Sequence, residues 1–140
     1  MPKFGEESTR KLSECHPDLQ KLFNEVIKGY DCTIITGHRN KEDQNKAVAA
    51  GLSKTPWPTG NHNAVPSNAV DVAPYPIKWG ATGDTKKDNK QIARFYHFAG
   101  YVKAKAEQLG IKIRFGGDWN SNNDFEDQTF DDLDHCERVI

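Results

Sequence analysis

The strongest constraint on the fold of this chain is the alternation of short apolar runs with longer helical segments. Helices are expected at 17–29, 41–50 and 92–109, and apolar residues recur at three- and four-residue spacing in the first and last of these. Four short runs read as strands, namely 32–35, 69–73, 111–115 and 135–140. This order predicts an α+β fold with a small, mainly antiparallel sheet and flanking helices.

Proline and glycine mark where these elements begin and end. Pro17 suits the first turn of a helix, and Gly29, Gly51 and Gly110 suit helix ends. Ser8 is expected to cap a further short helix before Pro17. Residues 52–68 contain three prolines and many polar side chains, which predicts a long functional loop without regular structure.

Length and charge narrow the function classes. The chain has 140 residues, the usual size of one domain, so we expect a single domain over 1–140. Its formal net charge is -1 and its lysines are scattered among acids, which argues against a nucleic-acid partner. The three cysteines form no framework spacing, and this favours folding in a reducing compartment.

The chain shows neither a signal peptide nor a membrane span. The N-terminus is polar and lacks an apolar h-region, and no stretch approaches the roughly 20 apolar residues that cross a bilayer. We therefore expect synthesis in the cytoplasm. A substrate outside the membrane would require a separate release step.

Three residues could form a metal site. Asp71 lies in an apolar run, where a carboxylate is costly without a partner, and His62 and His135 border neighbouring segments. Two histidines and one carboxylate with a fourth position left open are typical of catalytic zinc. From spacing alone the alternative remains that His62 is a loop residue and Asp71 a turn or cap acid.

Longer motifs resemble a known family. They are the run from Thr55 to Pro76, the run Phe-Gly-Gly-Asp-Trp-Asn at 115–120 with Asp-Asp-Leu-Asp-His-Cys-Glu at 131–137, and Gly37-His38-Arg39 with Gln44. In this order they resemble the motifs of VanY-type D-alanyl-D-alanine carboxypeptidases. Within that group they are most similar to phage endolysins that are L-alanyl-D-glutamate endopeptidases. The resemblance extends from about Pro17 to the C-terminus.

The resemblance implies a role for individual residues. It implies zinc ligands at His62, Asp71 and His135, a catalytic carboxylate at Asp132, and a cationic residue beside the scissile peptide at Arg39. Two positions depart from the family pattern, because Gly60 replaces a frequent serine and Asp134 a frequent proline. We expect Asp131 and Asp134, the acids on either side of Asp132, to face away from the reacting water.

Other residues near the motifs have competing interpretations. Cys136 is expected to be buried and structural, since adjacent strand residues point to opposite faces, whereas Glu137 shares the face of His135 and either supports it or is an exposed acid. Trp57 and Trp119 either line a peptide groove or belong to the core. His16, His38 and His97 lie outside the motifs.

The loop at 118–124 could bind a second metal ion. Asp118, Asn120, Asn122 and Asp124 alternate as the early oxygen ligands of a calcium loop do, but the later glycine and glutamate of that pattern are absent. A polar turn rich in Asn and Asp is the alternative.

The resemblance implies a monomeric phage enzyme that hydrolyses a peptide bond in peptidoglycan stem peptides, between L-alanine and D-glutamate. It also implies that a holin-type pore releases the protein to the cell wall. Two alternatives stay open: a D-alanyl-D-alanine carboxypeptidase with the same zinc site, and a non-catalytic, metal-stabilised wall-binding domain.

Overall fold

The computed structural model describes residues 2–140. Its elements are α1 (Glu6–Ser13), α2 (Pro17–Gly29), β1 (Cys32–Thr36), α3 (Lys41–Ala49), the 3-10 turn η1 (Asn61–Asn63), β2 (Ala69–Pro74), α4 (Thr85–Leu109), β3 (Ile113–Phe115) and β4 (His135–Arg138). The fold is α+β, as the sequence predicts. Among residues 2–140, no helix combines the length and the apolar character needed to cross a bilayer.

The helix ends follow from local chemistry. Pro17 occupies the first turn of α2, where the Nδ1 atom of His16 accepts a hydrogen bond from the backbone N–H of Asp18 at 3.0 Å. Gly110 ends α4 with a positive φ of 71°, a conformation that glycine adopts without steric cost. Helix α4 begins earlier than the apolar pattern predicts, because the side chain of Asp84 caps it by accepting from the N–H of Lys87.

The expectation that Ser8 caps the first helix is wrong. The N-cap of α1 is Gly5, and Ser8 lies buried inside the helix. Its hydroxyl accepts a hydrogen bond from the backbone N–H of Ile34 at 3.1 Å. Ser8 therefore links α1 to the first strand.

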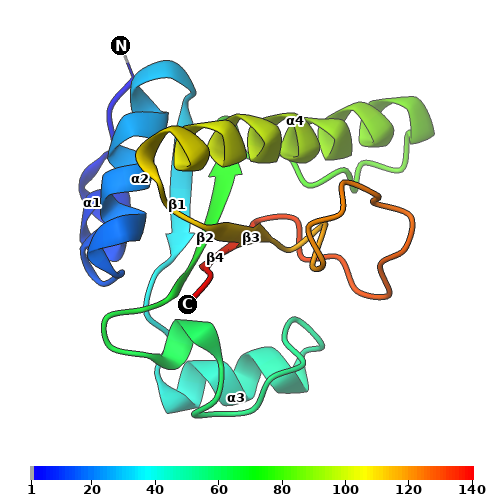
Figure 1. Ribbon diagram of the computed structural model, residues 1–140. Helices are drawn as coiled ribbons and strands as arrows, with labels where there is room; N and C mark the ends of the chain where they lie inside the picture. Colours follow the sequence, from blue (N-terminus) through cyan, green and yellow to red (C-terminus); the bar gives the residue numbers. More distant parts are fainter. Residues whose placement is uncertain (1) are drawn as a thin grey trace.

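The four strands form one antiparallel sheet in the order β1-β2-β4-β3. The C-terminal strand β4 thus lies between β2 and β3 (Figure 1). In the pairing of β2 with β4, Asp71 is opposite His135 and Val70 is opposite Cys136. The register therefore brings two of the expected metal ligands together.

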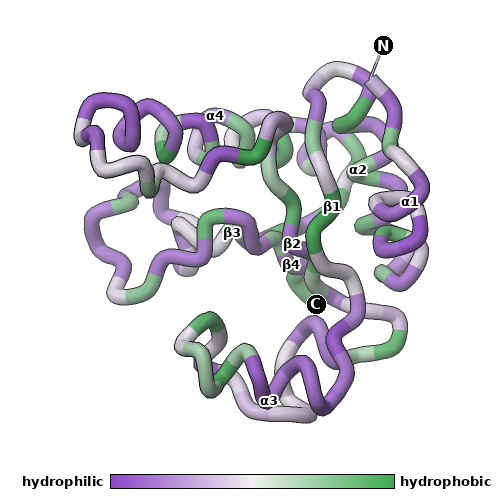
Figure 2. The backbone as a smooth tube through the Cα atoms, turned by 180° about the vertical axis from the view of Figure 1, so that it is seen from behind, coloured by the Kyte–Doolittle hydropathy of each residue, from purple (hydrophilic) through white to green (hydrophobic). Residues whose placement is uncertain are grey.

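The two faces of the sheet differ in chemistry. Val70, Val72 and Cys136 belong to the hydrophobic core, which also contains apolar residues of α1, α2 and α4. Figure 2 shows that hydrophobic segments gather on β1 and β2, whereas α3 is largely hydrophilic. Because strand residues alternate between faces, Asp71, His135 and Glu137 all lie on the face away from this core. That face carries the candidate site.

The loop from 52 to 68 is irregular, as expected, except for the single turn η1. This turn contains His62, which is buried. The loop therefore places the imidazole of His62 on the polar face of the sheet.

Candidate metal centre

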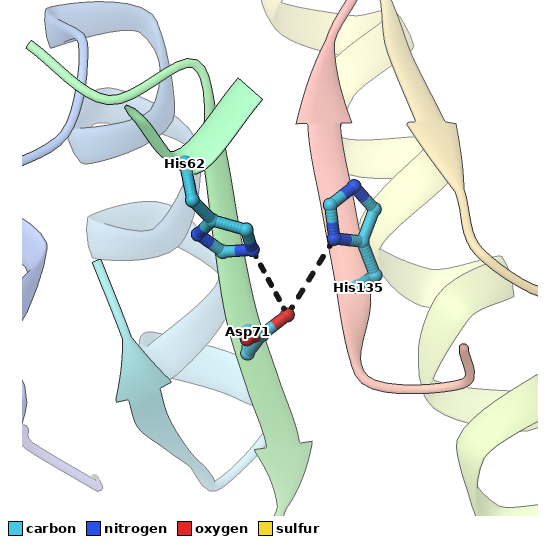
Figure 3. A group of neighbouring side chains, drawn as sticks. All are labelled: His62, Asp71 and His135. Atoms are coloured by element: carbon cyan, nitrogen blue, oxygen red, sulfur yellow. Dashed lines mark ion pairs between the residues drawn. The ribbon is translucent and has the colours of Figure 1, made fainter. Parts of the chain in front are cut away.

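His62, Asp71 and His135 converge on one point (Figure 3). The Oδ1 atom of Asp71 lies 3.2 Å from Nε2 of His62 and 3.5 Å from Nδ1 of His135. All three side chains are buried. The structure thus brings together the three residues for which the sequence predicts metal binding.

Each imidazole is held by a partner on its far nitrogen. Nδ1 of His62 lies 2.8 Å from the carbonyl oxygen of Gly37, so an N–H at Nδ1 leaves Nε2 free to bind a metal. Nε2 of His135 lies 2.8 Å from Oε1 of Glu137, and Nδ1 faces Asp71. The two histidines therefore offer different ring nitrogens.

The polar atoms at the centre of this group fit a cation. Nε2 of His62 and Oδ1 of Asp71 are buried, and neither forms a hydrogen bond of ordinary geometry with any of residues 2–140. Leaving buried polar atoms without a partner is costly. Two imidazole nitrogens and one carboxylate oxygen within 4.8 Å of one another form a donor set that suits a transition metal.

The pKa values of Asp71 and His135 are strongly shifted from their ordinary values. Burial raises the pKa of Asp71, but the charge of His62 and contact with His135 outweigh it and hold this pKa well below the usual range. Burial lowers the pKa of His135, but its contacts with the carboxylates of Asp71 and Glu137 raise it to about 9. Asp71 is therefore anionic at neutral pH and attracts positive charge.

Glu137 supports His135, as one of its two interpretations proposes. It is buried, and its second oxygen lies 3.4 Å from a guanidinium nitrogen of Arg114. Burial raises the pKa of Glu137, and hydrogen bonds to His135 and Asn61 act against it, so that the pKa is lowered. A carboxylate in this position orients the imidazole and fixes its tautomer.

Arg39 lies beside the group, on the connection between β1 and α3. One guanidinium nitrogen donates to Oδ2 of Asp71 at 3.2 Å, and another donates to the side-chain oxygen of Gln44 at 3.1 Å. Gln44 is almost fully buried, and its oxygen also accepts from the amide of Asn63. The arginine is therefore fixed in place and holds the second oxygen of Asp71.

The three neighbouring acids occupy different surroundings. Oδ2 of Asp132 lies 3.8 Å from Nδ1 of His135, whereas Asp131 is exposed. The expectation that Asp134 faces away is wrong, because a carboxylate oxygen of Asp134 lies within 4.8 Å of oxygens of Asp71 and Asp132. Burial and these two carboxylates raise the pKa of Asp134 to about 8.

A cavity of about 310 Å³ opens above the group. Its lining includes Arg39, His62, Asp132 and His135. Trp119 also lines it and places its ring 5.3 Å from the ring of His135, as expected for a residue of a peptide groove. Trp57 is half-buried and lies outside this lining and outside the core cluster.

Several residues of this cavity, among them Asn61, Lys54 and Phe130, are absent from the sequence-based prediction of the site. Asn61 lines it and contacts Glu137, while Lys54 and Phe130 line it from two different loops. The position of Asn61 directly before His62 is a signal that could have identified it, since a polar residue flanking a buried ligand often supports that ligand. The other two depend on how the loops fold, and the local sequence carries no such signal.

The remaining candidates have structural contacts. Cys136 is buried in the core, as expected. In the 118–124 loop, the amides of Asn120 and Asn122 both donate to Asp127, and Asp118 accepts from the N–H of Asn123. These contacts are those of a polar turn, and calcium binding here stays a prediction.

Comparisons with known proteins show the family of this chain. The family model described as phage L-alanyl-D-glutamate peptidase matches residues 1–139. The L-alanyl-D-glutamate peptidase of Escherichia phage T5 is 30% identical over 128 residues, which cover 90% of this chain and 88% of the relative. The crystal structure of Serratia marcescens L-Ala D-Glu endopeptidase ChiX has a TM-score of 0.67 and 23% identity, covering 97% of this chain and 89% of the other. This chain therefore belongs to the phage L-alanyl-D-glutamate peptidase family.

Proposed function

We propose that this chain is a zinc-dependent endopeptidase that hydrolyses the L-alanyl-D-glutamate bond of peptidoglycan stem peptides and acts as a phage endolysin. The observation that carries this proposal is the convergence of His62, Asp71 and His135 beside an open cavity that the two histidines line. Family membership supports the reaction and the bond. Residues 1–140 would act as one catalytic domain.

The donor set favours zinc among the available metals. Two neutral imidazoles and one carboxylate are typical ligands of catalytic zinc, whereas magnesium and calcium prefer oxygen alone. A zinc ion held by His62, Asp71 and His135 would supply Lewis acidity that activates water and polarises the scissile carbonyl.

The protein's own side chains would divide the remaining work. Asp132 faces the cavity beside His135, so its carboxylate can accept a proton from the attacking water and pass it to the departing amine. The guanidinium group of Arg39 lines the same cavity, where it can stabilise negative charge that develops on the carbonyl oxygen.

Mass spectrometry of purified peptidoglycan digested by the protein tests the proposal, because the new termini identify the bond. We expect new L-alanine carboxyl and D-glutamate amino termini. Release of a terminal D-alanine would instead identify a carboxypeptidase, and binding without cleavage would identify a wall-binding domain. Elemental analysis of the same preparation should find one zinc ion per chain. Release to the wall through a holin-type pore and a monomeric state stay predictions.

A further inference from the structure

The catalytic cavity contains a cation that the proposed chemistry does not use. Lys54 lines the cavity together with His62, Asp132 and His135. No acidic side chain among residues 2–140 forms an ion pair with its ammonium group, which lies 4.9 Å from the centre of the Phe130 ring. An aromatic face attracts an ammonium ion without occupying its N–H donors. Lys54 is therefore free to bind an anion.

The backbone on both sides of Lys54 is held in place. The side-chain amide of the buried Gln44 donates to the hydroxyl of Ser53 at 3.0 Å and to the carbonyl of Thr55 at 2.6 Å. The oxygen of the same Gln44 accepts from Arg39. One buried side chain thus connects the loop that carries Lys54 to the arginine beside Asp71.

The substrate of the proposed reaction brings an anion into this cavity. A D-glutamate residue whose nitrogen belongs to the scissile bond uses one carboxyl group for the onward amide and keeps the other free. Asp132 in the same cavity would repel this free carboxylate. Arg39 already donates to Asp71 and Gln44, so a second cation is needed to compensate the repulsion.

We propose that Lys54 binds the free carboxylate of the D-glutamate residue and makes the enzyme selective for stem peptides in which this group is not amidated. The inference rests on the proposed function and assigns the specificity of the same site. The carboxylate would lie against the ammonium group of Lys54 inside the cavity. Lys54 would act in substrate binding and take no part in proton transfer.

Two synthetic stem peptides that differ only at this group test the proposal. One carries the free carboxylate of D-glutamate and the other carries the carboxamide. We expect the wild-type enzyme to prefer the carboxylate peptide, and Lys54→Met to lose about tenfold in kcat/KM on it, mainly through KM. On the carboxamide peptide, Lys54→Met should behave as the wild type does. Lys54→Arg should restore the preference.

Lys46→Met is the matched control, since Lys46 is exposed on α3 and pairs with Glu42. This variant should cleave both peptides with the kcat/KM of the wild type. The inference would be overturned if Lys54→Met lost kcat/KM equally on both peptides. It would also be overturned if the preference for the carboxylate peptide survived Lys54→Met and disappeared in Arg39→Lys. If the wild-type enzyme cleaves neither peptide between L-alanine and D-glutamate, the proposed function itself is wrong, and this outcome is distinct from the other two.

Discussion

Asp131 and Asp132 are adjacent in the sequence but lie in different surroundings. Asp132 lines the cavity near His135, and Asp131 is exposed. We expect Asp132→Ala to retain zinc and lose about 10² to 10⁴ in rate, because it removes the proposed general acid and base and none of the proposed ligands. Asp131→Ala should keep most activity. Activity and zinc content are measured on the same sample, and an inactive Asp131→Ala beside an active Asp132→Ala would refute the assignment.

Arg39 makes two directed contacts that a lysine cannot reproduce. Its separate nitrogens donate to Asp71 and Gln44, and a lysine keeps the charge but loses this planar fork. Arg39→Lys should therefore bind zinc and turn over slowly. Steady-state kinetics with parallel metal analysis checks this expectation, and turnover equal to that of the wild type would show that Arg39 has no part in the reaction.

Glu137 fixes the tautomer of a proposed ligand. Glu137→Gln keeps the shape of the side chain and removes the charge that faces Nε2 of His135. Loss of such a supporting partner typically lowers metal affinity roughly 10- to 100-fold. Competition with a chromophoric chelator measures the change. Glu126→Gln, in an exposed part of the last loop, is the control and should bind zinc as the wild type does.

At the scale of elements, Gly116 is the position most sensitive to an added methyl group. Its N–H donates to the carbonyl of His135 and its carbonyl accepts from Asp132, and a Cβ there would clash with the backbone oxygen of Asp132. Gly116→Ala should lower the free energy of unfolding by about 1–3 kcal/mol and reduce activity by displacing Asp132.

Gly100 offers the opposite case for the same substitution. It lies inside α4, and a Cβ there would meet no atom within 4 Å. Gly100→Ala should stabilise the protein by roughly 0.5–1 kcal/mol, since alanine favours the helix more than glycine does. Urea unfolding of both variants measures the contrast, which equal effects would contradict.

The same elements show what a sequence can reveal. Strands and helices were predictable where apolar spacing or a terminal glycine marks them, as at Gly110. The start of α4 was missed because its first turns are polar, and Ser8 was misassigned because its partner, Ile34, is distant in the sequence. The candidate metal ligands His62, Asp71 and His135 were predicted from residue chemistry and motif resemblance, and the structure brings them together. The residues that face His135 across the cavity were not predictable, because the conformation of the loops determines which residues lie there.

At the scale of the whole molecule, the candidate metal ligands His62, Asp71 and His135 come from three separate segments of the chain, namely η1, β2 and β4. A metal that binds only the folded state at 100-fold its Kd adds about 2.7 kcal/mol of stability. Chelation should therefore lower Tm by roughly 5–10 °C, and added zinc should restore it. His62→Ala should show neither response in thermal unfolding. An unchanged Tm in chelated wild type would contradict a folded-state metal site.

The central position of β4 sets an order of events during synthesis. This strand pairs with β2 on one side and β3 on the other, yet its four residues are translated after both partners. A growing chain thus contains His62 and Asp71 before it contains His135 and Glu137. Because both pairings require the residues of β4, neither the sheet nor the candidate site can be complete before this strand is synthesised.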